Sequence, residues 1–279
     1  MELKILGSGG GEGYPALFCE CDHCKAARKA GGKSLRSLSQ TLIDGKLLID
    51  LPAATHAHCL SHGFGLGHIE HLLITHTHAD HYAPQILDMR GDGFAWNMQA
   101  EKLHIYGNEE VTRKFDGTFA LFPIRDAIRE NIVLHTVKAF TPFFAGEYEI
   151  TPLKAHHAPE EEPFNYIIDD GKTSLLYLVD TGYPFPETLS YIERCGKTFG
   201  CVVMDATMVV NYYEGHMNFA ENKKLKEYLC DKGACDGKTK FAITHITHNH
   251  AGLHEEIEKY FADTDIEVAY DGMTIAIGA

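Results

Sequence analysis

Five apolar, strand-like runs in this chain lead directly into residue types that bind metal ions. Along the chain, the runs LLIT, TPLKA, LLYLV, CVVM and FAIT lead into His76, the pair His156–His157, Asp180, Asp205 and His245. Strands of two packed sheets can bring their ends together at one edge, although they lie far apart in the sequence. The pattern therefore predicts one shared site at the edge of a pair of sheets.

Elsewhere the chain mixes strand-like and helix-like segments. Further strand-like runs, among them KLHIYG, NIVLHTV, FNYIID and MTIAIG, fall into two clusters, one in each half. QTLIDGKLLIDL predicts a β-hairpin that turns at Asp44–Gly45. Helices are expected within CKAARKAGGKS and YAPQILDMR and around 186–195, 219–231 and 252–262. We expect an α/β fold of two packed sheets with helices outside and, because no long linker interrupts the chain, a single domain over 1–279.

The charge balance limits the partners that we expect. The chain has 25 Lys and Arg against 39 Asp and Glu, a net charge of -14. Such a charge disfavours nucleic acid and anionic membranes as partners. No apolar run approaches the roughly 20 residues that a membrane span needs, and MELKILGSGG lacks the features of a signal peptide. We therefore expect a soluble, cytoplasmic protein.

Histidine is over-represented, with 18 residues, and the stretch THTHADH is its most informative group. His76 and His78 are two residues apart, so that in an extended turn both can face one cation. Asp80 and His81 follow where a helix is expected to begin, and they project towards a different point. Paired ligands of this kind suit two metal ions about 3.5–4 Å apart. Nitrogen and carboxylate donors fit Zn, Mn or Fe.

Several motifs follow one another along nearly the whole chain. They are GSGGGEGYPALFCECDHCKAAR, LLITHTHADH, TPLKAHH, LVDTG, MDATMVV, GHMN, THITHNH and VAYDGMTIAIG. In this order they resemble the metallo-β-lactamase superfamily and, within it, the PhnP-like phosphodiesterases of phosphonate breakdown. The resemblance implies a four-layer αββα sandwich, in which two mixed sheets are flanked by helices, with a dinuclear metal site at the edge between the sheets.

The resemblance also implies ligands for two divalent ions. One ion would take His76, His78 and His157, the other would take Asp80, His81 and His245, and Asp180 would bridge the two together with a water or hydroxide. His156 competes with His157 for this role, but the spacing after TPL favours His157. The expected ions are Zn or Mn, with Fe and Ni as further candidates.

By the same resemblance, the expected reaction is hydrolysis of a small phosphodiester, such as a phosphoribosyl cyclic phosphate, by the metal-bridging hydroxide. The catalytic candidates are Asp80 and His216. His216, which lies in GHMNF, would be the acid that protonates the leaving group. Asp205 either orients a metal-bound histidine or has a purely structural role. The expected partner is a small anionic substrate, and a homodimer is expected because related enzymes often form dimers.

Other functions remain open on the sequence. A PqqB-like protein of cofactor biosynthesis shares the cysteine-rich stretch, and tRNase Z-like and glyoxalase II-like hydrolases share a bridging carboxylate such as Asp180. A non-catalytic, metal-dependent binding protein is a third class. Flavodiiron-type members have Glu at the position of His78, which disfavours an oxygen-reducing role. No basic run that could grip a transfer RNA is present, which disfavours RNA processing.

The stretch FCECDHC predicts a separate structural zinc site near 19–24. A closed structural zinc site takes four ligands. Three thiols come from Cys19, Cys21 and Cys24. His23 and His250 are candidates for the fourth ligand, but the resemblance implies His248, three residues after His245. Such a site would tie the N-terminal loop to the strand end that carries His245.

Two features have no assigned role. Residues 52–71 form an expected helix and loop that either lines the pocket entrance or has no direct role. Its histidines are His56, His58, His62, His68 and His71. Basic residues that either hold a substrate phosphate or are solvated surface charges are Arg28, Lys33, Arg36 and Arg90.

Overall fold

The computed structural model describes residues 1–91, 93–249 and 251–278, and its strands form two seven-stranded sheets. The first sheet has the order β14 (Thr274–Ala276), β1 (Glu2–Gly7), β2 (Gln40–Ile43), β3 (Leu47–Ile49), β4 (His71–Leu73), β5 (Leu103–Gly107) and β6 (Ile132–Thr136). The second has the order β13 (Ile266–Val268), β12 (Lys240–Thr244), β11 (Phe199–Asp205), β10 (Ser174–Leu178), β9 (Phe164–Asp169), β8 (Tyr148–Lys154) and β7 (Phe143–Ala145). The C-terminal strand β14 therefore returns to complete the sheet of the N-terminal half.

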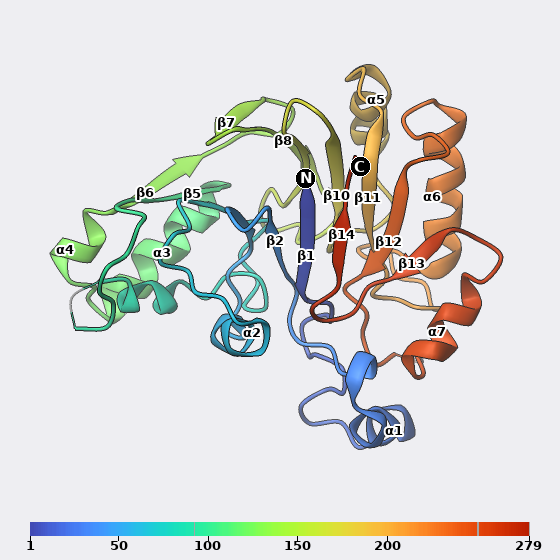
Figure 1. Cartoon of the computed structure of the whole chain (residues 1–279), viewed down its shortest axis with the longest axis horizontal. Helices are drawn as coiled ribbons and strands as arrows, with labels where there is room; N and C mark the ends of the chain where they lie inside the picture. The colour runs from blue at the N-terminus through green and yellow to red at the C-terminus, as the bar shows by residue number, and fades with distance from the viewer. Residues whose placement is uncertain (92, 250, 279) are drawn as a thin grey trace.

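Most of the helices flank the pair of sheets, whereas α1 lies beyond the ends of the strands (Figure 1). They are α1 (Asp22–Ala30), α2 (Thr55–His62), α3 (Glu109–Leu121), α4 (Asp126–Arg129), α5 (Pro186–Arg194), α6 (Phe219–Asp231) and α7 (His254–Tyr260), with the short 3-10 helices η1 (Gly32–Ser34) and η2 (Pro84–Met89). In Figure 1, α3 and α4 lie on the side of the first sheet, and α5, α6 and α7 lie on the side of the second. The four-layer αββα sandwich expected from the sequence is confirmed.

Alternating side chains produce these layers. In β10, Leu175 and Tyr177 belong to the core between the sheets, whereas Leu176 and Leu178 belong to the core beneath α5 and α6. Leu48 of β3 belongs to a third core, on the outer side of the first sheet. Successive residues of a strand point to opposite faces, so strands buried on both faces are apolar throughout. This is why runs such as LLYLV have no polar alternation.

Both sheets have the same pattern of strand directions. From β14 to β3 the neighbours pair antiparallel, and from β3 to β6 they pair parallel. Likewise, β7 to β10 pair antiparallel and β10 to β13 pair parallel. Parallel neighbours end at the same edge of a sheet, so the loops after β10, β11 and β12 emerge together.

Most of the predicted elements are present, with some differences. The hairpin is confirmed, since Thr41 pairs with Ile49, and Asp44 and Gly45 both have positive φ (49° and 67°), as a type I′ turn requires. The α-helix predicted in YAPQILDMR is wrong in type, because this segment forms the 3-10 helix η2. Six residues are too few to stabilise an α-helix by themselves, so packing decides their form. The short strand β7 and the helices α3 and α4 are additions to the prediction.

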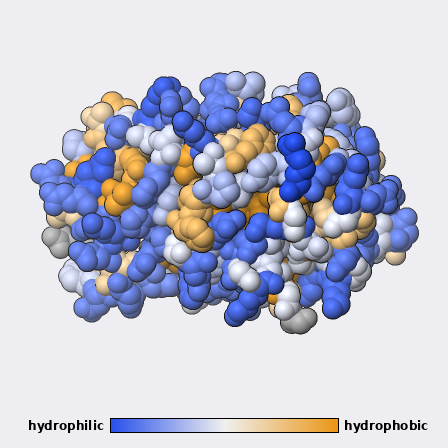
Figure 2. All heavy atoms as spheres, turned by 90° about the horizontal axis from the view of Figure 1, so that it is seen from above, coloured by the Kyte–Doolittle hydropathy of each residue, from blue (hydrophilic) through white to orange (hydrophobic). Residues whose placement is uncertain are grey.

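The exposed surface and the composition of the helices bear on whether the chain could cross a membrane. The face seen in Figure 2 is mostly hydrophilic, with hydrophobic residues in separate patches. Among the described residues, no helix combines the length and the apolar composition that crossing a membrane requires.

Candidate metal centre

Each residue of the expected metal-binding set lies in a loop that follows a strand. His76, His78, Asp80 and His81 follow β4, His157 follows β8, Asp180 follows β10 and His245 follows β12. β4 belongs to the first sheet and the other strands belong to the second. The site is therefore built across the edge at which strands of both sheets end.

The seven residues form two overlapping groups, and in each group the possible ligand atoms lie within 4.8 Å of one another. One group consists of His76, His78, His157 and Asp180, and the other consists of Asp80, His81, His245 and Asp180. The structure thus brings the residues together in the division that the family resemblance implied, with Asp180 as the shared member.

Asp180 lies at the centre of both groups. Its Oδ2 lies 3.2 Å from Nε2 of His76, 3.2 Å from Nε2 of His81 and 3.3 Å from Nε2 of His157. The residue is 3% exposed, so these nitrogens and the carboxylate meet away from bulk water. One carboxylate is therefore in reach of two cation positions at once.

The backbone turns sharply where three of the strands end. Asp50, Asp180 and His245 have φ values of 66°, 57° and 60°. This left-handed region is uncommon for residues other than glycine. Such conformations cost of the order of 1–3 kcal/mol and persist where the surrounding structure requires them. Here the turns aim the three side chains from the strand ends towards the shared site.

The outer ring nitrogens of the histidines have partners of their own. Nδ1 of His157 donates to the carbonyl of Gly215 (3.3 Å), Nδ1 of His76 lies 3.1 Å from Oγ1 of Thr75, and Nδ1 of His245 lies 2.7 Å from Oγ1 of Thr207. His78 has the opposite orientation, with Nε2 donating to Glu160 (3.2 Å) and Nδ1 facing His157 (3.1 Å). Partners of this kind fix the tautomer and leave the inner nitrogen free to face a cation.

Asp50 is a site residue that the sequence analysis did not identify. It is fully buried, and it accepts hydrogen bonds from Nδ1 of His81 (2.7 Å) and from the backbone N–H of Thr75 (2.8 Å). The sequence contains a pattern that could have revealed it. The apolar run LLI ends in Asp50, just as LLYLV ends in Asp180.

The carboxylates favour positive charge at this site. Burial disfavours a charged His81, yet Asp80 and Asp50 raise the pKa of His81 well above its usual range. Burial likewise opposes the charge of His245, but Asp180 and Asp205 raise its pKa to about 9. A divalent cation would experience the same field, because the interaction depends on the charge rather than on its carrier.

Two buried polar atoms also support cation binding at the site. Nε2 of His76 and Oδ1 of Asp180 form no hydrogen bond of good geometry among the described residues, although Oδ2 of Asp180 lies 3.2 Å from the first atom and Nδ1 of His216 lies 3.0 Å from the second. Burying such atoms without a partner is costly, so each needs an explanation. Imidazole nitrogen and carboxylate oxygen are suitable donors for Zn, Mn or Fe. The residues present therefore fit the divalent ions that the family resemblance implies.

His216 and Asp205 lie beside the shared carboxylate. Nδ1 of His216 lies 3.0 Å from Oδ1 of Asp180 and 3.7 Å from Oδ2 of Asp205. Burial opposes the charge of His216, but Asp180 and Asp205 raise its pKa to about 10. Asp205 is fully buried and also accepts from the N–H (3.0 Å) and the hydroxyl (2.7 Å) of Thr207. Its Oδ2 lies 3.4 Å from Nδ1 of His245, and Thr207 contacts both residues, so the position of Asp205 suits both an orienting and a structural role.

His156 lies outside the two groups and lines a neighbouring cavity of about 750 Å³. Its ring packs against Phe185 with a centroid distance of 4.2 Å, and its Nε2 lies 3.4 Å from Glu214. The same cavity is bounded by His78 and His157, so it opens directly onto the candidate metal centre. His156 therefore belongs to the wall beside the centre and not to either group of possible ligands.

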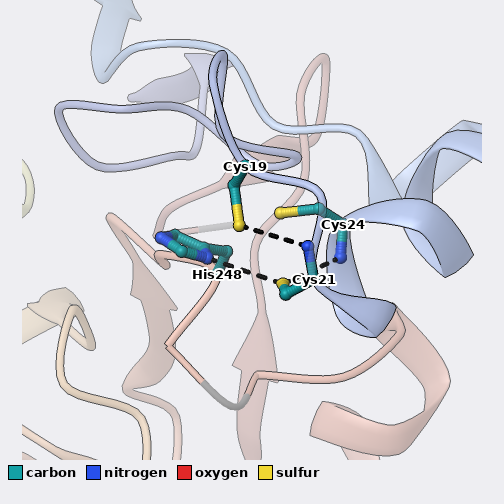
Figure 3. A group of neighbouring side chains, drawn as sticks. All are labelled: Cys19, Cys21, Cys24 and His248. Atoms are coloured by element: carbon teal, nitrogen blue, oxygen red, sulfur yellow. Dashed lines mark hydrogen bonds between the residues drawn. The ribbon is translucent and has the colours of Figure 1, made fainter.

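The cysteine-rich stretch forms a second candidate site (Figure 3). The possible ligand atoms of Cys19, Cys21, Cys24 and His248 lie within 4.8 Å of one another. Sγ of Cys21 lies 3.9 Å from Nδ1 of His248, near the separation of about 3.5–3.8 Å that tetrahedral ligands of zinc have. The backbone N–H of Cys24 and the ring of His248 lower the pKa of Cys21 to about 6, which favours a thiolate.

This cysteine site joins the N-terminal loop to the loop after β12. Gly9 forms a β-bridge with Ile246, and the N–H of Ile246 donates to the carbonyl of Ser8 (3.0 Å). His248 follows two residues later, opposite the cysteines. His23 is not part of this group, and His250 lies outside the described residues. The geometry therefore favours His248 over His23 as the fourth ligand.

The other histidines and basic residues noted in the sequence lie elsewhere. His58 is 2% exposed and lies 2.6 Å from Oε1 of Gln40, so it holds α2 against β2 instead of lining the pocket entrance. Arg36 is likewise buried, with an exposed fraction of 3%, and it donates to the carbonyl of Ala269 and the hydroxyl of Ser8. It is thus a buried structural residue and not a surface charge. Arg28 donates to the carbonyls of 16 and 19 and supports the cysteine-rich loop.

Comparison with known proteins gives a consistent result. A family model described as a beta-lactamase superfamily domain matches residues 47–251. Coenzyme PQQ synthesis protein B of Acinetobacter baylyi is 24% identical over 324 residues, which cover 99% of this chain and 100% of that protein. An octanoyltransferase of Porphyromonas gingivalis is 23% identical over 99% of this chain, which spans only 52% of that protein.

Three solved structures share the fold over nearly the whole chain. A diphosphatase from the PhnP family has a TM-score of 0.75 at 20% identity, covering 99% of this chain and 97% of that one. Zinc-bound PqqB from Methylobacterium extorquens has a TM-score of 0.72 at 17% identity, covering 99% and 100%. The short form of human tRNase Z has a TM-score of 0.66 at 15% identity, covering 99% of each chain. At these identities the likeness establishes the fold alone.

Proposed function

The chain belongs to the metallo-β-lactamase superfamily, and from this premise we propose that it is a phosphodiesterase that uses two divalent metal ions. The observation that carries the proposal is the pair of four-residue groups that share Asp180. Six side chains from three other loops converge on this carboxylate, and such a set suits two ions better than one. The likeness to a PhnP-family diphosphatase adds support for a phosphorus-centred substrate.

The residues of the chain would divide the work of hydrolysis. Two ions in these groups would lower the pKa of a water for attack on phosphorus and neutralise the phosphate oxygens. His216 is held through Nδ1, 3.0 Å from Asp180, which leaves its Nε2 to meet the leaving group. A proton from this nitrogen would neutralise the departing oxygen. Asp80 would complete the ligands of the group that contains His81 and His245.

The cavity beside the centre favours a small substrate over a polyanion. Its described lining includes four acidic residues, Glu160, Glu161, Glu162 and Glu214. Lys154 is the single Lys or Arg among the described lining residues, and its Nζ lies 2.9 Å from Glu187. Acidic walls repel a nucleic acid backbone. A small phosphodiester, even one that also carries a terminal phosphate, presents only a few negative charges to these walls, and the ions would offset that repulsion. We therefore favour a cyclic phosphodiester such as a phosphoribosyl cyclic phosphate.

A second candidate function follows from a specific observation. The match to Coenzyme PQQ synthesis protein B extends over the full length of both proteins. A role of that kind in cofactor biosynthesis would not require hydrolysis of phosphodiesters. Metal content separates the two proposals, since the phosphodiesterase would hold about three ions per chain, two at the centre and one at the cysteines. A content of about one ion would favour the second candidate.

The decisive experiment is a panel of cyclic and linear phosphodiesters and a diphosphate ester, assayed with Zn or Mn. We expect turnover of bis(p-nitrophenyl) phosphate and of a cyclic phosphate, and a loss of at least about 100-fold in Asp80→Ala. Asp231→Ala, which changes an exposed carboxylate at the end of α6, is the matched control and should retain activity. Full metal loading without turnover would favour a non-catalytic binding protein. Unchanged activity in Asp80→Ala would show that the assigned site is wrong.

We propose a homodimer and a cytoplasmic location. Light scattering of the purified protein tests the first proposal, and fractionation of cells that express the chain tests the second.

A further inference from the structure

A second cavity lies on the outer side of the first sheet. Its volume is about 240 Å³, and its floor consists of Leu48, Leu72 and Leu103 from β3, β4 and β5. The 3-10 helix η2 and the segments 66–69 and 95–98 cover it. None of the seven residues of the candidate metal centre lines this cavity. It is therefore separate from the site described above.

The lining of this cavity is almost wholly apolar. Apart from Arg90, every described residue of the lining is Leu, Ile, Met, Ala or Gly. Cavities with apolar walls exclude water and accept apolar molecules. A methylene group is about as large as the share of one water in the liquid, about 30 Å³. The cavity thus has room for an alkyl chain of about eight carbons.

Arg90 brings a single positive charge to this wall. Its Nη2 donates to the carbonyls of Ala100 (2.6 Å) and Glu101 (3.1 Å). Its Nη1 is buried and has no hydrogen-bond partner among the described residues, and no carboxylate of the described chain forms an ion pair with Arg90. A buried guanidinium N–H without an acceptor is costly. An acidic group would supply the missing acceptor and the opposite charge.

The rim of the cavity is apolar and exposed. Met89, which lines the cavity, is 49% exposed, and Phe94 and Trp96 in the neighbouring loop are 61% and 75% exposed. Trp96 lies between the lining residues Ala95 and Met98, and it is the single Trp of the chain. An amphiphilic molecule would meet this rim first, and the indole would report its arrival.

We propose that this cavity binds an amphiphile with one acidic head group, with an alkyl chain of about eight carbons against Leu48, Leu72 and Leu103 and the head group beside the guanidinium of Arg90. The size of the ligand follows from the cavity volume and its apolar chain follows from the lining. The sign of the head group follows from the guanidinium of Arg90, which forms no ion pair with a carboxylate among the described residues. The proposal is independent of the phosphodiesterase activity, since it uses none of the same residues.

The test compares four ligands with the same chain and different head groups. Octanoate, octyl phosphate, octanol and octyltrimethylammonium are titrated into the full protein, with Trp96 fluorescence and calorimetry as readouts. We expect saturable binding of octanoate or octyl phosphate, at least about tenfold tighter than that of octanol. Absence of saturable binding by either acid, or equal binding of octyltrimethylammonium, would overturn the proposal.

Variants separate the charge from the volume. Arg90→Gln should weaken the binding of the two acids to the level of octanol. Leu72→Phe, which fills the cavity, should weaken the binding of every ligand that binds the wild type. Arg194→Gln, at an exposed position of α5, is the matched control and should bind as the wild type does. If Arg90→Gln fails to fold, the comparison of head groups in the wild-type protein still decides.

Vesicles of phosphatidylglycerol distinguish a free amphiphile from a membrane surface. Binding to vesicles without binding of octanoate or octyl phosphate would overturn the proposal and favour a membrane contact. The proposal would be supported if octanoate or octyl phosphate binds and neither zinc nor a phosphodiester substrate displaces it.

Discussion

Nδ1 of His81 donates a hydrogen bond of 2.7 Å to Oδ2 of Asp50, and neither residue is exposed to solvent. Asp50 also accepts from the N–H of Thr75 (2.8 Å), so its position is fixed by the backbone that precedes the THTHADH motif. The pair turns the other ring nitrogen of His81 towards Asp180, at 3.2 Å. A carboxylate outside the seven proposed ligands thus orients one of them.

Replacing Asp50 should therefore weaken metal binding without removing a ligand. We expect Asp50→Asn to lower the affinity of the group containing Asp80, His81 and His245 by about 10–100-fold. Competition with a chelator measures this affinity, and Asp231→Asn is the control. Unchanged affinity would mean that the ring of His81 is held by packing alone.

The choice between His157 and His156 can be tested by metal content. Because only His157 belongs to the group around Asp180, we expect His157→Ala to lose about one ion per chain and His156→Ala to retain all of them. Elemental analysis of both purified variants measures the difference. The reverse result would assign the ligand to His156.

The cysteine site should lose its metal independently. We expect Cys21→Ser to lose one zinc, to unfold at a lower temperature, and to keep the two ions at the strand ends. Cys230→Ser, which changes an exposed thiol, is the control. Loss of every ion at once from Cys21→Ser would contradict the separation of the two sites.

The role of His216 depends on the leaving group. A poor leaving group needs a proton, whereas p-nitrophenolate departs without one. We therefore expect His216→Asn to slow the hydrolysis of alkyl esters by about 10²–10⁴-fold. The same variant should slow the hydrolysis of p-nitrophenyl esters far less. His56→Asn, at an exposed position of α2, is the control. Equal losses for both ester classes would indicate that His216 acts on the metal site and not on the leaving group.

The buried His58 should make stability depend on pH. Burial lowers its pKa to about 4, although Asp271 acts in the opposite sense. Above a pH of about 6.5 the ring is neutral in both the folded and the unfolded chain, so its contribution is complete there. As the pH falls from about 6.5 to 4, only the unfolded chain takes up the proton, and about 3 kcal/mol of stability is lost.

Denaturation with urea between pH 7 and pH 4 measures this dependence. We expect His58→Gln to unfold more easily at pH 7, with a difference from the wild type that shrinks by about 3 kcal/mol at pH 4. His56→Gln on the same helix should show no such convergence, because His56 is exposed. Parallel curves for the wild type and His58→Gln would contradict the assignment.

The identity of the elements and of most candidate ligands was accessible from the sequence because both depend on local patterns. Apolar runs that are buried on both faces predict strands, and Asp44–Gly45 predicts the hairpin turn. The order of the motifs supplied the family. Asp50 follows the same strand-end pattern as Asp180 and was accessible in principle.

Only the tertiary structure decided which of these residues meet. His81 contacts Asp50, which lies 31 positions away in the sequence, and Cys21 contacts His248, which lies 227 positions away. The cavity beside Arg90 exists because η2 and the neighbouring loops cover the first sheet incompletely. Local patterns determine which face or end of a strand a side chain occupies. The distance between two such ends depends on how the sheets pack, and packing is a property of the whole chain.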